Sequence, residues 1–250
     1  MERIRHFWLS QAGAEYASAA VSSEFALWLC QNGASPDLIC QCLDIAKDEI
    51  AHAMLSYDVA REAGHSGGLA GGTNLVGGSP RPFAESRKNL LDVILRFFCL
   101  GETIAVPLFA AMRKRCRHET ALAAYTRIIA DEPRHSEFGW VALAWMQANW
   151  PEVHAWIGEC FANSLRQLAG EYYCLDEYVP PLTETERAWG MLPRLDYAVI
   201  FEKTVLNQCA RRLEVYGIDV ATIWSGIRQD LPGQAQPQAV EAAATTATSA

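Results

Sequence analysis

Positive charge is scarce in this chain of 250 residues. Lysine and arginine together number 21 against 29 aspartates and glutamates, so the net charge is −8 at pH 7. Binding to nucleic-acid phosphates requires a basic surface, and the composition therefore argues against a nucleic-acid partner. The most basic short stretch, Arg113–His118, is interpreted as a solvated helix end.

The chain contains no Cys-x-x-Cys pair among its eight cysteines, and no secretory signal is recognisable. We therefore expect neither a zinc motif nor a disulfide framework, but reduced thiols in a cytoplasmic protein. A long uninterrupted apolar run is absent too. The best candidate for a membrane span, Asn89–Met112, is interrupted by Asp92, Arg96 and Glu102. It is predicted to be a buried core helix, and no membrane partner is expected.

Strand-like alternation is also missing, and half of the residues are apolar, which is enough to build a helical core. Ser35 and Pro36 are predicted to cap and begin a helix. The glycine-rich stretch 64–82 is too long for a hairpin turn and suits a long crossover between helix pairs, or a flexible lid. Helices are predicted over about 10–32, 36–63, 84–114, 119–149, 152–169, 183–190 and 195–216.

The predicted organisation is an all-α protein in three parts. Residues 1–150 form a four-helix bundle, and residues 151–228 form a helical extension packed on it. Residues 229–250, which are poor in apolar side chains other than alanine and lack aromatics, form a disordered tail.

Two strings of the form Asp-Glu-x-x-His stand out, Asp48–His52 and Asp131–His135, and each lies in a predicted helix. Residues three apart share a helix face, so each string directs a carboxylate and an imidazole to one point. Two such pairs on facing helices supply most of the ligands of a dinuclear metal centre. One pair alone would mean little. A third pair, Glu62 with His65, has Gly64 between its members at a helix end and is interpreted as coincidental.

A centre of this kind needs one more carboxylate from each of the other two helices. Glu102 lies in an otherwise apolar stretch, and because a buried unpaired carboxylate is costly, a metal is its natural partner. The first helix offers Glu15 and Glu24, which lie about 180° apart around its axis. In an antiparallel pair of helices Glu15 stands level with Glu49, whereas Glu24 lies roughly two turns away. Glu15 is therefore the predicted ligand.

Six residues form the predicted ligand set: Glu15, Glu49, His52, Glu102, Glu132 and His135. Four carboxylates balance the charge of two divalent cations, and a set without thiolate suits iron, or manganese. A ligating histidine usually donates its free N–H to an acceptor. We expect Asp131 to accept from His52, and Asp48 from His135. The alternative to a metal is a bundle with buried ion pairs, for which Arg134 is the only cation near these faces.

Tyr125 lies two turns before Glu132 on the same helix face. It is either a core residue, which is the favoured interpretation, or a redox-active neighbour of the centre. The helices beyond Trp150 are predicted to wall a pocket.

Over roughly Gln11–Asn149 the chain resembles the ferritin-like non-haem di-iron carboxylate superfamily, in particular poorly characterised bacterial ferritin-like proteins. The resemblance rests on the strings Glu15–Ser18, Gly101–Ala105 and Asp131–His135. It implies a ferritin-like four-helix bundle with a long crossover plus additional C-terminal helices, two iron ions, and ligand roles for the six residues above. Pro133 departs from the pattern, since the family has an ordinary helix former there, and is expected to kink its helix.

Two ferrous ions held together can give electrons to oxygen. The expected function is thus a di-iron oxygenase or oxidase that uses O2 to oxidise a small organic substrate, by hydroxylation, desaturation, N-oxygenation or oxidative cleavage. A ferroxidase or iron-handling protein and a non-catalytic helical scaffold are the alternatives. An external electron donor and a homodimer are compatible with this interpretation.

Overall fold

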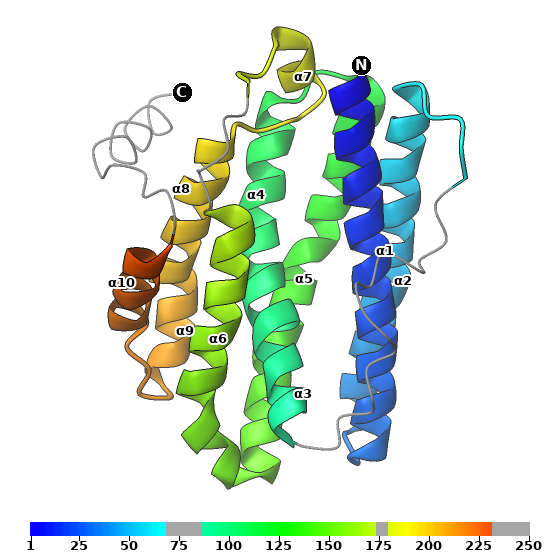
Figure 1. The fold of residues 1–250 in the computed structure, drawn as a ribbon. Helices are drawn as coiled ribbons and strands as arrows, with labels where there is room; N and C mark the ends of the chain where they lie inside the picture. Colours follow the sequence, from blue (N-terminus) through cyan, green and yellow to red (C-terminus); the bar gives the residue numbers. More distant parts are fainter. Residues whose placement is uncertain (69–86, 174–179, 232–250) are drawn as a thin grey trace.

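The computed structural model describes residues 1–68, 87–173 and 180–231, and in these residues every regular element is a helix (Figure 1). The all-α prediction is thereby confirmed. The predicted tail from residue 232 onward, and the predicted crossover or lid over 69–82, lie outside the described residues. The elements are α1 (Glu2–Gln31), α2 (Pro36–Glu62), α3 (Arg87–Val93), η1 (Ile94–Gly101), α4 (Glu102–Arg115), α5 (Glu119–Asn149), η2 (Pro151–Val153), α6 (His154–Tyr172), α7 (Glu184–Ala188), α8 (Arg194–Thr204), η3 (Val205–Cys209), α9 (Ala210–Glu214) and α10 (Val220–Asp230).

Local sequence signals explain several of these boundaries. The Ser35 side chain accepts a hydrogen bond from the backbone N–H of Leu38, and Pro36 begins α2, as predicted. Gly33 follows the end of α1 and has φ +72°. This conformation allows the Ala34 N–H to donate to the Leu29 carbonyl at 3.0 Å. Helix α5 begins and ends at the predicted residues.

Two boundary predictions were wrong. Helix α1 begins at Glu2 rather than near residue 10, because the buried Ile4 and Trp8 share one helix face and the Trp8 indole donates to the Trp189 carbonyl. The helix predicted over 195–216 is not the last one, because α10 follows it. The Asp219 carboxylate caps α10 by accepting from the Thr222 N–H at 3.0 Å.

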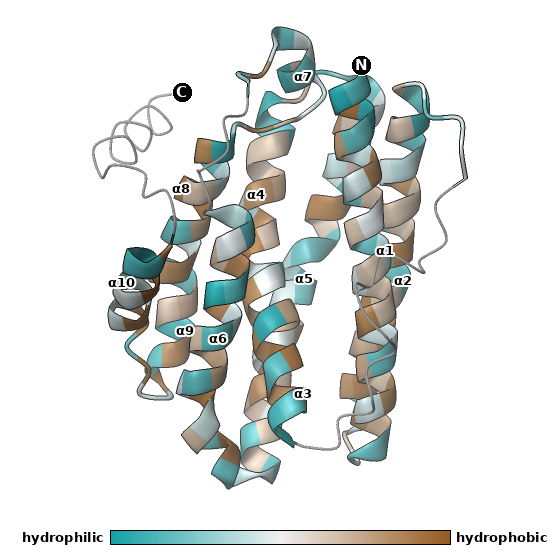
Figure 2. Ribbon diagram, viewed as in Figure 1, coloured by the Kyte–Doolittle hydropathy of each residue, from teal (hydrophilic) through white to brown (hydrophobic). Residues whose placement is uncertain are grey.

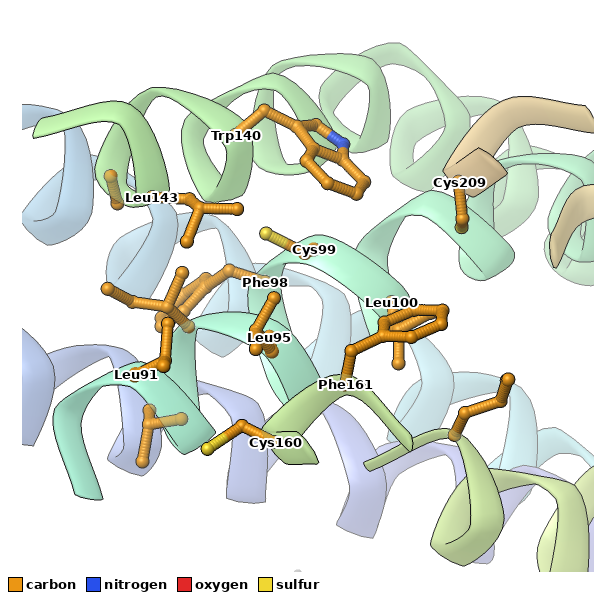
Figure 3. Packing of buried hydrophobic residues seen from close by; sticks show 14 of the residues in the cluster. Leu91, Leu95, Phe98, Cys99, Leu100, Trp140, Leu143, Cys160, Phe161 and Cys209 are labelled. Carbon is orange, nitrogen blue, oxygen red and sulfur yellow. The ribbon is translucent and has the colours of Figure 1, made fainter. Parts of the chain in front are cut away.

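Helix α1 packs along α2, α2 packs on α5, and α5 packs on the continuous helical segment η1–α4. Helices α6 and α8 lie on the outer side of that segment (Figure 1). Apolar residues gather on the facing sides of these helices (Figure 2). In one part of the core, Leu95 and Phe98 of η1 meet Leu143 of α5 and Phe161 of α6 (Figure 3).

The segment between Arg87 and Arg115 is long and apolar enough to span a membrane by composition, and most of it is buried inside the protein. It is therefore a core helix, as predicted. Its middle part, η1, is a π-helix that ends immediately before Glu102. A Cβ on Gly139 would lie 2.4 Å from the Phe98 carbonyl carbon, so the backbones of α5 and η1 are in direct contact there. Such π segments are frequent at functional sites.

The seven cysteines in the described residues form no disulfide, which agrees with the expectation of free thiols. Burial raises the pKa of Cys160 to about 11 and that of Cys209 to about 12, so these thiols stay protonated at neutral pH. They act as packing groups within the apolar core.

Candidate metal centre

The six predicted ligands lie together in the interior. Glu15 comes from α1, Glu49 and His52 from α2, Glu102 from the start of α4, and Glu132 and His135 from α5. None of these six residues is more than 8% exposed. They form two groups, and within each group one ligand atom per residue lies within 4.8 Å of the others. The groups are Glu15, Glu49, His52 and Glu132, and Glu49, Glu102, Glu132 and His135.

Glu49 and Glu132 belong to both groups, so the two half-sites share these carboxylates. His135 Nδ1 lies 3.0 Å from Glu49 Oε1 and 4.0 Å from Glu102 Oε2. His52 Nδ1 lies 3.8 Å from Glu49 Oε2 and 3.7 Å from Glu132 Oε1. The imidazole centroids are 5.7 Å apart. Each half-site thus has one imidazole, one carboxylate of its own and two shared carboxylates.

Four buried atoms at the middle of the site have no hydrogen-bond partner: His52 Nδ1, His135 Nδ1, Glu49 Oε2 and Glu132 Oε2. The Nδ1 atoms are near carboxylate oxygens, but not in hydrogen-bond geometry. An unsatisfied buried polar atom costs about 1–3 kcal/mol, and such atoms are rare in folded proteins. Four of them on residues of the two ligand groups are compatible with a metal site, since a cation would accept their lone pairs.

The outer nitrogens of both histidines meet the aspartates of the opposite strings. His52 Nε2 lies 3.1 Å from Asp131 Oδ2, and His135 Nε2 lies 3.4 Å from Asp48 Oδ2. These are the cross-helix pairings expected from the sequence. An aspartate at Nε2 favours the tautomer that carries the proton there, which leaves the Nδ1 lone pair facing inward.

Arg127 and Arg134 join these aspartates, a role that sequence reasoning missed. Arg134 lies 2.8 Å from Asp48 and 3.3 Å from Asp131, and Arg127 lies 3.0 Å from Asp131 and 3.4 Å from Asp48. Both side chains are about half exposed, so each pair alone is weak. The signal for them was the spacing: they stand four residues before and three after Asp131. Arg134 therefore belongs to the outer network and lies outside both ligand groups.

The remaining candidates are placed as follows. Gln11, one turn before Glu15, donates to its Oε1 at 2.6 Å. Glu24 is half-buried and lies in neither group.

Tyr125 is fully buried against Trp8, with ring centroids 4.8 Å apart, and its hydroxyl donates to the Gly190 carbonyl at 3.4 Å. Tyr125 is thus a core residue that belongs to neither ligand group. Helix α5 continues without a break through Pro133.

The pKa values of the buried carboxylates are consistent with a site that binds cations. Burial, with the charge of Glu49 next in effect, raises the pKa of Glu15 well above its usual value and that of Glu102 to about 7. Burial and the charges of Glu102 and Glu49 likewise raise the pKa of Glu132. Burial acts on Glu49 in the same direction, but the nearby imidazoles of His135 and His52 and the carboxyl group of Glu15 outweigh it and lower that pKa to about 2. Burial and mutual repulsion disfavour the ionised forms of Glu15, Glu102 and Glu132, and a bound cation would favour them.

Comparison of the chain with protein-family models, with curated proteins and with solved structures finds no match.

Proposed function

We propose that this chain is a ferritin-like di-metal protein in which α1, α2, the η1–α4 segment and α5 form the four-helix bundle. In this proposal Glu15 and His52 are the separate ligands of one ion, and Glu102 and His135 are those of the other. Glu49 and Glu132, which belong to both groups, would be available to either ion. The observation that supports it best is the set of four inward-facing, unpartnered ligand atoms, two on imidazoles and two on the shared carboxylates.

The donor set fits iron, with manganese as the second choice. Carboxylate and imidazole ligands without thiolate suit these ions, and four carboxylates neutralise two divalent charges. Each half-site has four protein groups, fewer than the six positions of an octahedral ion, which leaves room for small molecules. The seven described cysteines contribute nothing to either group.

The proposed reaction is the O2-dependent oxidation of a small organic substrate. Two adjacent ferrous ions, when bound, supply electrons to oxygen. The protein's own part is to hold the ligands: Asp48 and Asp131 orient the imidazoles, and Gln11 holds Glu15. Helices α6 and α8, together with η3, cover the outer side of η1–α4, and α10 packs on α6 and η3. This added layer supports an organic substrate over simple iron storage, since storage needs only the bundle.

The test is to load the metal-free protein with ferrous iron under anaerobic conditions, count the bound metal, and then admit oxygen. We expect two irons per chain and a transient visible absorption on mixing with oxygen. Tight binding of a single iron, or of none, would contradict the dinuclear assignment. Two bound irons that do not react with oxygen would contradict the oxidase assignment alone.

A further inference from the structure

A cavity of about 380 Å³ lies where the N-terminal part of α1, the end of α6 and the start of α8 come together. This volume suits a small organic ligand, whose sites typically measure about 300–1,000 Å³. None of the six proposed metal ligands lines the cavity. Most of its lining is apolar or aromatic, and includes Phe7, Tyr172, Leu182, Met191 and Tyr197.

The charged groups at this cavity already have partners or stand at its rim. Arg3 donates to the Pro180 carbonyl at 3.3 Å and forms an ion pair with Glu186 at 3.3 Å. Arg194 has an interaction partner of its own, and both it and Glu171 are exposed. Arg3 and Arg194 also line an adjoining, more open cavity, which places them at the entrance. In the described part of the chain the inner wall is thus uncharged, and a charged ligand would be costly to bury against it.

The inner wall rests on a stack of three aromatic rings. The ring centroid of Tyr172 lies 5.8 Å from that of Phe201 and 6.5 Å from that of Tyr197, with interplanar angles of 15° and 26°. Tyr172 and Tyr197 line the cavity, whereas Phe201 is fully buried behind them. Because the stack fixes both tyrosine rings, a flat ring in the cavity can add to it in the offset or edge-to-face geometry that aromatic pairs prefer.

The hydroxyl groups of Tyr172 and Tyr197 are the polar groups of this inner wall. Neither hydroxyl has a hydrogen-bond partner among the residues that the structure describes. Enclosed tyrosine hydroxyls usually find one, so these two are left to pair with an occupant of the cavity. Burial raises the pKa of both phenols, so both stay protonated at neutral pH and can donate as well as accept.

The cavity lies two turns of α1 from the half-site that contains Glu15. Phe7, Gln11 and Glu15 stand on successive turns of one side of this helix. Phe7 lines the cavity, and Gln11 donates to Glu15 Oε1 at 2.6 Å. The rise from Phe7 to Glu15 is about 12 Å.

Tyr172 connects the cavity with the same centre from the side of α6. Burial is the main reason for its raised pKa, and the charges of nearby glutamates add to it. Three of these glutamates are proposed metal ligands: Glu102, Glu15 and Glu132. The aromatic wall therefore stands between the cavity and the metal centre.

We propose that this cavity binds an uncharged aromatic molecule that carries a hydrogen-bonding group, with its ring against Tyr172 and Tyr197 and that group bonded to their hydroxyls, and that such molecules are the substrate class. An uncharged ring matches the apolar inner wall, and a hydroxyl or carbonyl group on the ring matches the two phenols. Only the substrate assignment rests on the proposed function, because binding in the cavity needs no metal.

2-Naphthol is the probe. Its controls are 2-naphthoate, which is an anion, and naphthalene, which has no hydrogen-bonding group. Titration of the full chain should show 2-naphthol binding about tenfold tighter than 2-naphthoate or more, because the anion must be buried against an uncharged wall. The double variant Tyr172→Phe/Tyr197→Phe should lower the affinity for 2-naphthol by about fivefold, the net effect of one hydrogen bond, and leave that for naphthalene unchanged. Leu182→Trp, which fills the cavity, should abolish the binding of both.

Tyr216→Phe is the control variant, since Tyr216 packs on the core but does not line the cavity, and its affinity for 2-naphthol should be unchanged. Circular dichroism and metal content separate loss of binding from loss of fold, and the double variant carries the test if Leu182→Trp does not fold. Equal affinities for 2-naphthol and 2-naphthoate, or undiminished binding in folded Leu182→Trp, would overturn the cavity proposal. An unchanged affinity for 2-naphthol in the double variant would overturn the role of the hydroxyls.

The position of the bound molecule is read from the proton relaxation of 2-naphthol with manganese(II) loaded in the centre, referenced to zinc(II). The enhancement should correspond to a distance of about 12 Å. If two metals load and 2-naphthol binds without such an enhancement, the substrate assignment is wrong. If two metals load and 2-naphthol does not bind, the cavity proposal fails while the proposed function stands. If 2-naphthol binds but no metal loads, the proposed function fails and only the binding site remains.

Discussion

Asp131→Asn is the substitution that tests the outer support of the centre most sharply. Asparagine keeps the size of the side chain but removes the negative charge that favours the proton on His52 Nε2. Asp131 is only 5% exposed, and its contact with His52 is 3.1 Å long. Loss of such a partner typically lowers metal affinity by about 10- to 100-fold, which is about 1.4–2.8 kcal/mol.

The two ligand groups predict which ion of the proposed centre should be affected. His52 belongs to the group with Glu15, so that ion should lose affinity, whereas the ion held through His135 should change much less. Asp48→Asn should act on the other ion and more weakly, because the Asp48 contact is longer, at 3.4 Å, and Asp48 is more exposed than Asp131. Folding should be little affected, because Arg127 and Arg134 are half exposed and can turn to solvent.

The assay is titration with cobalt(II) against a competing chelator, in which visible absorption reports each bound ion. Asp44→Asn is the matched control, since Asp44 lies on the same helix as Asp48 but pairs with the exposed Lys47. Unchanged affinity for both ions in the Asp131 variant, or an equal loss for both, would refute the role given to this aspartate.

Four further outcomes are expected. Glu102→Ala should abolish the two-metal stoichiometry, as measured by metal analysis, and unchanged loading would rule out its ligand role. Removing the metal with a chelator should lower the free energy of unfolding by about 8 kcal/mol, which is about 4 kcal/mol for each of the two ions, relative to protein with metal at 1,000 times the dissociation constant of each site, as seen by calorimetry. Burial raises the pKa of Glu15, Glu102 and Glu132, so protons held by the metal-free protein must leave when metal binds. The affinity for metal should therefore rise with pH through about 7. A metal affinity that is flat from pH 5 to 8 would contradict this. Gly139→Ala should lower the free energy of unfolding, measured with denaturant, by about 3 kcal/mol, because the new Cβ would collide with the Phe98 backbone. The control Gly170→Ala should not destabilise the protein, because a Cβ there meets nothing within 4 Å.

Much of the helical order follows from local sequence. Helix α5 ends at the predicted residue because Trp150 and Pro151 stop a long periodic pattern. The positions of Glu15 and Glu102 followed from helix level and from the apolar face around each carboxylate, and the structure places both beside the Asp-Glu-x-x-His pairs. These inferences needed only the helical repeat and an antiparallel turn.

What the sequence did not reveal depends on contacts between distant segments. The π-helix η1 lies in backbone contact with α5 at Gly139, and no local sequence pattern indicates this contact. The start of α1 depends on the hydrogen bond that the Trp8 indole donates to the Trp189 carbonyl, 181 residues further along the sequence. Arg127 and Arg134 form their ion pairs because Asp48 of α2 and Asp131 of α5 lie close together beside them.

The proposed centre holds two metal ions among the six ligands inside the bundle. Crystals of the iron-loaded protein, measured at the iron absorption edge, test this directly. The proposed centre should give two anomalous peaks roughly 3.5–4 Å apart, each next to one histidine Nδ1. A single peak, or peaks away from His52 and His135, would contradict it.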